Sequence, residues 1–286
     1  MQDQRPDSLP RIALLGAGSM GRAILAGLLA PGVTADSIAV TTRSARSAAE
    51  LPSRGGLSVA SVDHAPDANR IAASEADVVI LAVKPAGVLA LAADIASAVR
   101  EGAIVVSVAA GVPTAALEEV LPGTAVVRAM PNTPATVGLG VTGLSAGAAA
   151  DAKALDLVAR VFATVGTVHR VPEAQLDALT AISGSGPAYV FYLVEKLAAA
   201  GSTLGLDPEL STALAAETFR GAAELLVQSG EAPEVLRAKV TSPNGTTEKA
   251  IAVFDANDVP QILEAAAEAA RRRSAELAAQ YGTRPR

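Results

Sequence analysis

The sequence has 286 residues, half of them hydrophobic, which is enough chain for two domains with a sizeable core. A net charge of −6, without a run of Lys and Arg among aromatic residues, argues against nucleic-acid binding. The absence of cysteine excludes disulfides and thiolate metal sites, and two histidines are too few for a multi-histidine site, so no metal is expected.

Strand-like and helix-like segments alternate in the N-terminal half. A continuous β-branched run such as 77–83 is typical of a strand buried on both faces of a parallel sheet. The alternation therefore predicts an α/β Rossmann-type domain, with helices covering the sheet. The predicted strands are 11–15, 38–40, 77–83, 103–108, 125–129 and 140–144, and the predicted helices are 20–30 and 87–99.

The C-terminal half contains only helix-like segments, separated by the Gly, Pro and Asn residues that end and start helices. The chain is therefore predicted to have a disordered tail at 1–10, a dinucleotide-binding domain at 11–170 and an all-α domain at 171–286. The predicted helices of the second domain are 173–182, 187–204, 208–229, 234–239, 247–255 and 259–281.

The chain is expected to be cytoplasmic and not associated with a membrane. Residues 1–10 are polar and lack the apolar core of a signal peptide. The most apolar later stretch, 187–206, contains Glu195 and Lys196 and falls short of a membrane span of about 20 apolar residues.

The strongest local motif is a glycine-rich turn between the first strand and the first helix, which is the context that a phosphate-binding turn needs. The first glycine permits the tight turn, the second admits a pyrophosphate, and the third allows close helix packing. An ordinary strand–helix turn is the alternative. The motif consists of Gly16, Ala17, Gly18, Ser19, Met20 and Gly21.

The end of the second strand indicates which dinucleotide binds. NAD enzymes usually carry an acid there for the ribose 2′-hydroxyl, whereas residues 40–44 contain none and include Arg43 beside hydroxyl side chains. An arginine suits a 2′-phosphate, so NADPH is favoured, with NADH left open. The alternative is that Arg43 is simply a surface residue.

Other strand ends and loops carry further candidates. Lys84 and the small residues 107–111 follow buried strands, where open α/β sheets bind ligands. Residues 130–134 have turn-forming residues, and a turn is the safer interpretation there. Loops 183–187 and 241–247 each precede a helix and are potential anion sites, or else plain helix–helix turns.

Taken together, these motifs resemble the pyrroline-5-carboxylate reductase family over nearly the whole chain. The matching segments are GAGSMG at 16–21, LAVKP at 81–85, VAAGV at 108–112, MPNTP at 130–134, SGSGPAY at 183–189 and VTSPNGTTEKA at 240–250. The resemblance implies reduction of the ring C=N bond of 1-pyrroline-5-carboxylate to L-proline by NAD(P)H. It also implies dimers formed by the helical domains, which often assemble into a decameric ring.

The resemblance also implies roles for single residues. Thr247 is the candidate catalytic residue, expected to orient the imine nitrogen while solvent supplies the proton. The implied cofactor contacts are Gly16, Ala17, Gly18, Ser19, Met20, Gly21, Arg43, Ser44, Asn69, Val83, Lys84, Pro85, Ala109, Ala110 and Gly111. The implied substrate contacts are Glu173, Ser242, Gly245, Thr246 and Thr247.

One position departs from the family pattern, and three alternatives stay open. Asn244 stands where the family usually has glycine, and Asn tolerates left-handed backbone better than most residues. A β-hydroxyacid dehydrogenase would need a catalytic lysine in the helical domain, and neither Lys196 nor Lys239 sits in that family's pattern. A reductase of another cyclic imine and a non-enzymatic NADP-binding protein are the other two alternatives.

Overall fold

The computed structural model describes residues 9–31, 38–53 and 57–282. The chain divides into two compact units, the first containing Met1–Gly184 and Ala270–Arg286 and the second containing Ser185–Ala269. Most of the predicted tail lies outside the described residues. The predicted domain boundary at 170/171 falls at the end of the last strand, and residues 171–184 group with the first unit.

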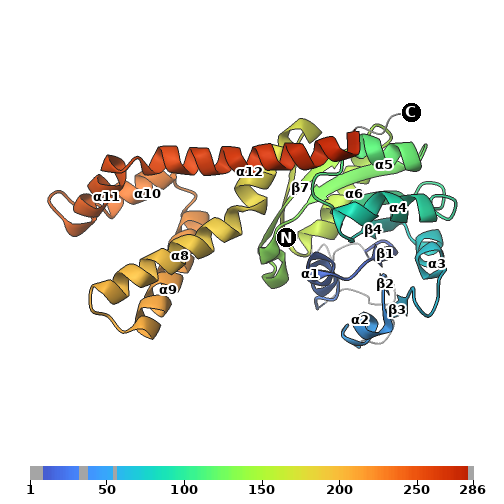
Figure 1. Ribbon diagram of the computed structural model, residues 1–286, viewed down its shortest axis with the longest axis horizontal. Helices are drawn as coiled ribbons and strands as arrows, with labels where there is room; N and C mark the ends of the chain where they lie inside the picture. The colour runs from blue at the N-terminus through green and yellow to red at the C-terminus, as the bar shows by residue number, and fades with distance from the viewer. Residues whose placement is uncertain (1–8, 32–37, 54–56, 283–286) are drawn as a thin grey trace, which may run out of the picture. The chain divides into compact units, whose positions relative to one another are not determined.

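The first unit is built on an eight-stranded sheet of order β3-β2-β1-β4-β5-β6-β7-β8 (Figure 1). Strands β1 to β6 run parallel to one another, β7 pairs antiparallel to β6, and β8 pairs parallel to β7. The strands are β1 (Ile12–Leu15), β2 (Ile38–Thr42), β3 (Ser58–Ser61), β4 (Val78–Leu81), β5 (Ile104–Ser107), β6 (Ala125–Met130), β7 (Gly140–Ala146) and β8 (Gly166–Arg170).

Helices cover both faces of this sheet, which buries the central strands completely. Ile80 and the other residues on its face of the sheet pack against α1 (Ser19–Leu28) and α6 (Ala152–Ala163). Val79 and the other residues on its face pack against helices on the opposite side of the sheet. The helices on that side are α3 (Ala68–Glu75), α4 (Pro85–Ile95) and α5 (Thr114–Val120). Strands β1, β4 and β5 therefore read as continuous apolar runs, because alternate side chains enter two different cores.

The six predicted strands are present, but the sequence prediction missed two strands and four helices of this unit. β3 is largely exposed and β8 is polar, so neither has the apolar signal of a buried strand. The missed helices are α3, α5, α6 and the five-residue α2 (Ala45–Ala49). Thr133–Val137 forms a 3-10 turn (η2) between β6 and β7.

From Glu173 onward, the segment that follows β8 is helical except for a bend at Ser185, where the sequence predicted a helix and then a loop. A 3-10 turn at Glu173–Gln175 (η3) leads into α7 (Leu176–Leu179), and a π-helical turn at Thr180–Gly184 (η4) leads into α8. The expected loop at 183–187 is therefore reduced to a bend at Ser185, which is the N-cap residue of α8. Four glycine and serine residues favour a break by propensity, but packing such as that of Gly184 on Met130 limits the break to Ser185.

The second unit is helical, as predicted. Helices α8 and α9 pack side by side along much of their length (Figure 1). The elements are α8 (Gly186–Thr203), α9 (Pro208–Ser229), α10 (Pro233–Lys239), α11 (Thr246–Ala256) and the first part of α12 (Val259–Gly282). No described helix combines the length and the apolarity that crossing a bilayer requires.

Candidate dinucleotide site and substrate loop

The glycine turn has the geometry that its three glycines predict. Gly16 has a φ of +99°, and a Cβ there would lie 2.8 Å from the carbonyl oxygen of Ala82. A Cβ on Gly21 would collide with the carbonyl oxygen of Gly16. Gly18, by contrast, has no atom within 4 Å of its Cβ position, so its side of the turn is open to a ligand.

The start of α1 offers backbone amides next to this opening. Gly18 is the N-cap residue and no side chain caps the helix. Its first amides lack helical partners by geometry, and the helix dipole favours an anion there. Ser19 and Met20 therefore stand where phosphate oxygens of a dinucleotide are held in such folds.

Three predicted cofactor contacts, Arg43, Ser44 and Asn69, lie at or beside the end of β2. The Thr41 hydroxyl donates to Asn69 Oδ1 at 2.6 Å, which fixes that amide beside the sheet edge. Ser44 caps α2, accepting from the Ser47 amide at 3.3 Å. Arg43 is exposed, and its guanidinium has no ion pair within the described part of the chain. It is thus available to a 2′-phosphate.

An acid that the sequence analysis did not single out lies beside Arg43. The Asp63 amide donates to the Arg43 carbonyl at 3.2 Å, and Asp63 Oδ2 accepts from the Ala45 amide at 3.1 Å. Hydrogen bonds from Ser61, His64 and then Ala45 lower the pKa of Asp63 to about 2. The carboxylate thereby ties the end of β3 to the start of α2.

The ends of β4 and β5 lie at the same edge of the sheet. Val83 contacts the glycine turn, since its Cγ1 lies 2.9 Å from the Cβ position of Gly16. Lys84 is exposed at the N-cap of α4, and Pro85 begins that helix. Ala109 and Ala110 follow β5, with the Ala109 amide donating to Ser107 Oγ at 3.2 Å.

Gly111 packs against the C-terminal part of α12 within the first unit. Its φ is +75°, and a Cβ there would lie 2.9 Å from Leu277 Cβ. The glycine is therefore required by a close approach of two chain segments. This requirement does not depend on a cofactor.

The 130–134 segment is a structural turn. Asn132 is buried; its amide nitrogen donates to the Ser183 carbonyl at 2.9 Å, and its Oδ1 accepts from the Val141 amide at 2.8 Å. With both ends of the amide in use, Asn132 fits the turn interpretation favoured by the sequence.

Glu173 belongs to a cluster that the sequence does not reveal. Its Oε1 accepts from the Thr114 amide at 2.8 Å, and its Oε2 accepts from the Thr114 hydroxyl at 2.6 Å. Arg128, on β6, places Nη1 3.4 Å from Oε1. Thr114 and Arg128 are buried, so the cluster lies mostly out of water.

The predicted substrate loop belongs to the second unit, whereas Glu173 belongs to the first. Gly245 is the N-cap of α11, which begins at Thr246, and the Gly245 amide donates to the Ser242 carbonyl at 3.0 Å. No side chain caps α11, so its first amides, including those at Thr246 and Thr247, offer a place for a carboxylate.

The position that departs from the family pattern has a left-handed backbone. Asn244 has a φ of +61°, and its amide donates to Glu248 Oε2 at 2.9 Å. Asparagine can adopt this conformation at low cost, and the Glu248 carboxylate closes the turn. The substitution therefore leaves a tight turn in front of α11.

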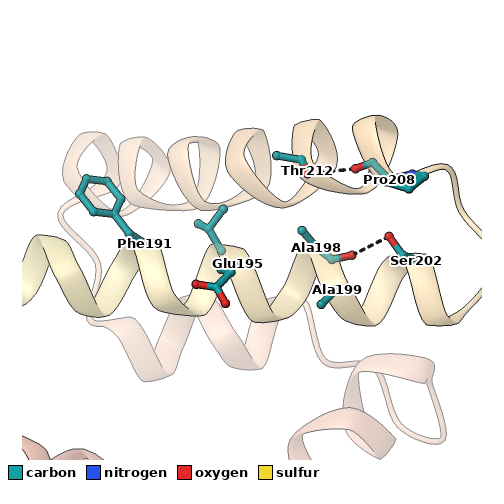
Figure 2. Close-up of a pocket in the computed structure, with 8 residues that line it drawn as sticks. Phe191, Glu195, Ala198, Ala199, Ser202, Pro208 and Thr212 are labelled. Carbon is teal, nitrogen blue, oxygen red and sulfur yellow. Dashed lines mark hydrogen bonds between the residues drawn. The ribbon is translucent and has the colours of Figure 1, made fainter.

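A groove of about 520 Å³ lies between α8 and α9. Figure 2 shows Phe191 and Glu195 on α8, and Thr212 on α9 donating to the Pro208 carbonyl. None of the predicted site residues lines this groove. Its lining residues are Phe191, Val194, Glu195, Ala198, Ala199, Ser202, Pro208 and Thr212.

Parallel strands ending in a glycine turn, with an open amide-bearing helix start, define the class of dinucleotide-dependent oxidoreductases. Comparison with known proteins narrows the class. A family described as NADP oxidoreductase coenzyme F420-dependent matches residues 11–111. A family described as pyrroline-5-carboxylate reductase dimerisation matches residues 173–277.

Whole-chain relatives agree. The pyrroline-5-carboxylate reductase of Pseudomonas aeruginosa is 42% identical over 277 residues, covering 96% of this chain and 99% of that protein. That of Mycobacterium tuberculosis is 41% identical, covering 94% and 97%. The chain belongs to the pyrroline-5-carboxylate reductase family.

Solved structures give the same result. A pyrroline-5-carboxylate reductase from Coxiella burnetii has a TM-score of 0.88 at 37% identity, covering 94% of this chain and 99% of that one. The Plasmodium falciparum pyrroline carboxylate reductase, solved with NADP bound, has a TM-score of 0.80 at 27% identity, covering 94% and 98%. The predicted family and the predicted fold class, a Rossmann-type domain followed by a helical dimerisation domain, are confirmed.

Proposed function

We propose that the chain reduces 1-pyrroline-5-carboxylate to L-proline, the last step of proline biosynthesis, with NADPH as the preferred hydride donor. The observation that carries the proposal is the 42% identity with the pyrroline-5-carboxylate reductase of Pseudomonas aeruginosa over 96% of the chain. The shape of the glycine turn supports it, because only Gly18 leaves room for a ligand.

The cofactor half of the proposal rests on residues at one edge of the sheet. The turn of Gly16, Gly18 and Gly21 and the start of α1 hold the pyrophosphate, and Arg43 and Ser44 meet the 2′-phosphate. The bound nicotinamide supplies the hydride. The remaining proposed contacts are Ala17, Ser19, Met20, Asn69, Val83, Lys84, Pro85, Ala109, Ala110 and Gly111.

The substrate half rests on the loop in front of α11. The amides at Gly245 and Thr246 and the Ser242 hydroxyl hold the substrate carboxylate, which the helix dipole favours. Thr247 orients the imine nitrogen, and solvent delivers the proton. The substrate contact expected for Glu173 is not part of this proposal, because Thr114 and Arg128 already engage both of its oxygens.

The dimerisation family that matches residues 173–277 makes the chain a homo-oligomer. We propose a homodimer formed through the helical unit, with the α8–α9 groove buried by the second copy, and a decameric ring built from such dimers. A cytoplasmic location, without nucleic-acid or membrane partners, completes the proposal.

The decisive test is oxidation of NADPH by the purified protein with racemic 1-pyrroline-5-carboxylate, with NADH in parallel and proline measured as product. Rapid oxidation with matching proline formation supports the proposal. If NADPH binds without being consumed, the protein is a binding protein or acts on another cyclic imine, and a panel of ring sizes separates those two outcomes.

A further inference from the structure

The segment 108–113, which follows β5 at the cofactor edge of the sheet, is anchored at three points. At its start, the Ala109 amide donates to the buried Ser107 hydroxyl. In its middle, Gly111 lies against Leu277 of α12. At its end, Thr114 is held by Glu173 through both its amide and its hydroxyl. Of these anchors, only the last uses a charged side chain.

Both carboxylate oxygens of Glu173 are already used inside the cluster. Each carboxylate oxygen already accepts a hydrogen bond from Thr114, and Oε1 also faces Arg128 at 3.4 Å. The Glu173 side chain retains 30% of its exposure, whereas the Arg128 side chain retains 4%. Arg128 Nε and Nη2 are buried without a hydrogen-bond partner among the described residues, so Glu173 is the only carboxylate that this cation meets there.

The two hydrogen bonds to Glu173 fix Thr114, the first residue of α5, in position and orientation. The preceding segment consists of small residues, which bring backbone close to whatever lies at the end of β5. In open α/β sheets, the reactive end of a dinucleotide lies at such strand ends. A displacement of about 1 Å in a surface of this kind lowers a rate by as much as about a hundredfold.

We propose that Glu173 is a positioning residue for hydride transfer, acting through Thr114 to hold the 108–113 segment beside the nicotinamide. The inference rests on the proposed function and deepens it, because it gives Glu173 a role at the cofactor and none at the substrate carboxylate. Arg128 serves the same end, because its buried guanidinium faces the Glu173 carboxylate from inside the cluster.

The test uses Thr114→Val, which keeps the shape and the amide but removes the hydroxyl, with Thr114→Ser as the matched control. We expect Thr114→Val to lower kcat about tenfold, with the KM for pyrroline-5-carboxylate changed less than about twofold. Thr114→Ser keeps the hydroxyl and should have the kcat of the parent protein. Glu173→Gln should lower kcat to a similar extent, and the double variant should be no worse than Glu173→Gln alone. Additive losses, or a KM for the imine that rises with Glu173→Gln while Thr114→Val is silent, overturn the inference.

A second measurement does not need turnover. Hydrogen exchange at the amides of residues 108–112 should be faster in Glu173→Gln than in the parent protein, while exchange in β5 itself stays unchanged. Unchanged exchange in 108–112 contradicts the positioning role. If the parent protein shows no reductase activity, the proposed function fails, and this measurement still decides whether Glu173 holds the segment.

Discussion

The carbonyl oxygen of Gly16 lies against the α-carbon of Gly21, so closely that a methyl group on Gly21 has no space. The contact joins the end of β1 to the first turn of α1 and leaves Gly18 between them as the exposed glycine of the three. The tightness of the turn and its openness to a ligand thus belong to different residues, and the two properties can be tested separately.

Gly18→Ala should leave folding intact and weaken NADPH binding about tenfold or more, because the methyl group enters empty space where the pyrophosphate approaches. Gly21→Ala should instead lower the thermal unfolding temperature, because the added atom collides with the backbone. Cofactor titration and thermal melts of both variants test this. Equal loss of binding and stability in Gly18→Ala would contradict the division of roles.

Replacing Arg43 should change which dinucleotide the protein prefers. A charge-assisted hydrogen bond contributes about 1.5–3 kcal/mol, so Arg43→Ala should lower kcat/KM with NADPH by about ten- to a hundredfold. The kcat/KM of Arg43→Ala with NADH should stay close to that of the parent protein, since NADH lacks the 2′-phosphate.

Arg46→Ala is the matched control for Arg43. Arg46 is an arginine on the adjacent α2, with 93% of its side chain exposed and only a 3.8 Å pair to Glu50. If Arg46→Ala lowers the NADPH preference as much as Arg43→Ala, the effect is one of general charge, and the assignment of Arg43 is wrong.

How far the sequence predicts this molecule depends on the distance over which a signal acts. The strands β1, β4 and β5 and the glycine turn are local patterns, and each was predictable from a few consecutive residues. Thr114 and Glu173 are 59 positions apart and meet only because β8 extends the sheet and delivers the chain to the start of α5. β8 itself is polar and largely exposed, so no local sequence pattern predicts either the strand or the contact between Thr114 and Glu173.

The low pKa of Asp63 predicts a pH-dependent contribution to stability. The pKa is about 2 in the folded protein and 3.8 ordinarily, so the carboxylate stabilises the fold above about pH 4 and loses that contribution as the pH falls toward 2. The difference in unfolding free energy between the parent and Asp63→Asn should therefore be constant near neutrality and shrink below pH 4. Urea unfolding over this range measures it.

Ser61→Ala should raise the pKa of Asp63, because the hydrogen bond from Ser61 is the largest cause of its depression. A titration of the Asp63 carboxyl by carbon NMR reads this directly. A midpoint near 3.8 in the parent protein would contradict the hydrogen-bond network around α2.

Asn244 provides the last prediction, which concerns the turn in front of α11. Asn244→Ala should destabilise the protein by about 1 kcal/mol, because a Cβ-bearing residue without a local hydrogen-bonding group resists a φ of +61°. Asn244→Gly should change stability by less than about 0.5 kcal/mol, since relief of the left-handed strain is offset by the greater freedom of glycine in the unfolded chain.

Chemical denaturation measures the stability of both Asn244 variants. The KM for pyrroline-5-carboxylate tests whether the loop still binds the substrate. The Asn244 amide still donates to Glu248 in either variant, so the turn keeps its hydrogen bond and the KM of Asn244→Gly should stay within about twofold of the parent. A large rise in KM with Asn244→Gly would mean that the asparagine side chain contacts the substrate. In that case the departure from the family pattern would be a feature of recognition rather than of backbone shape.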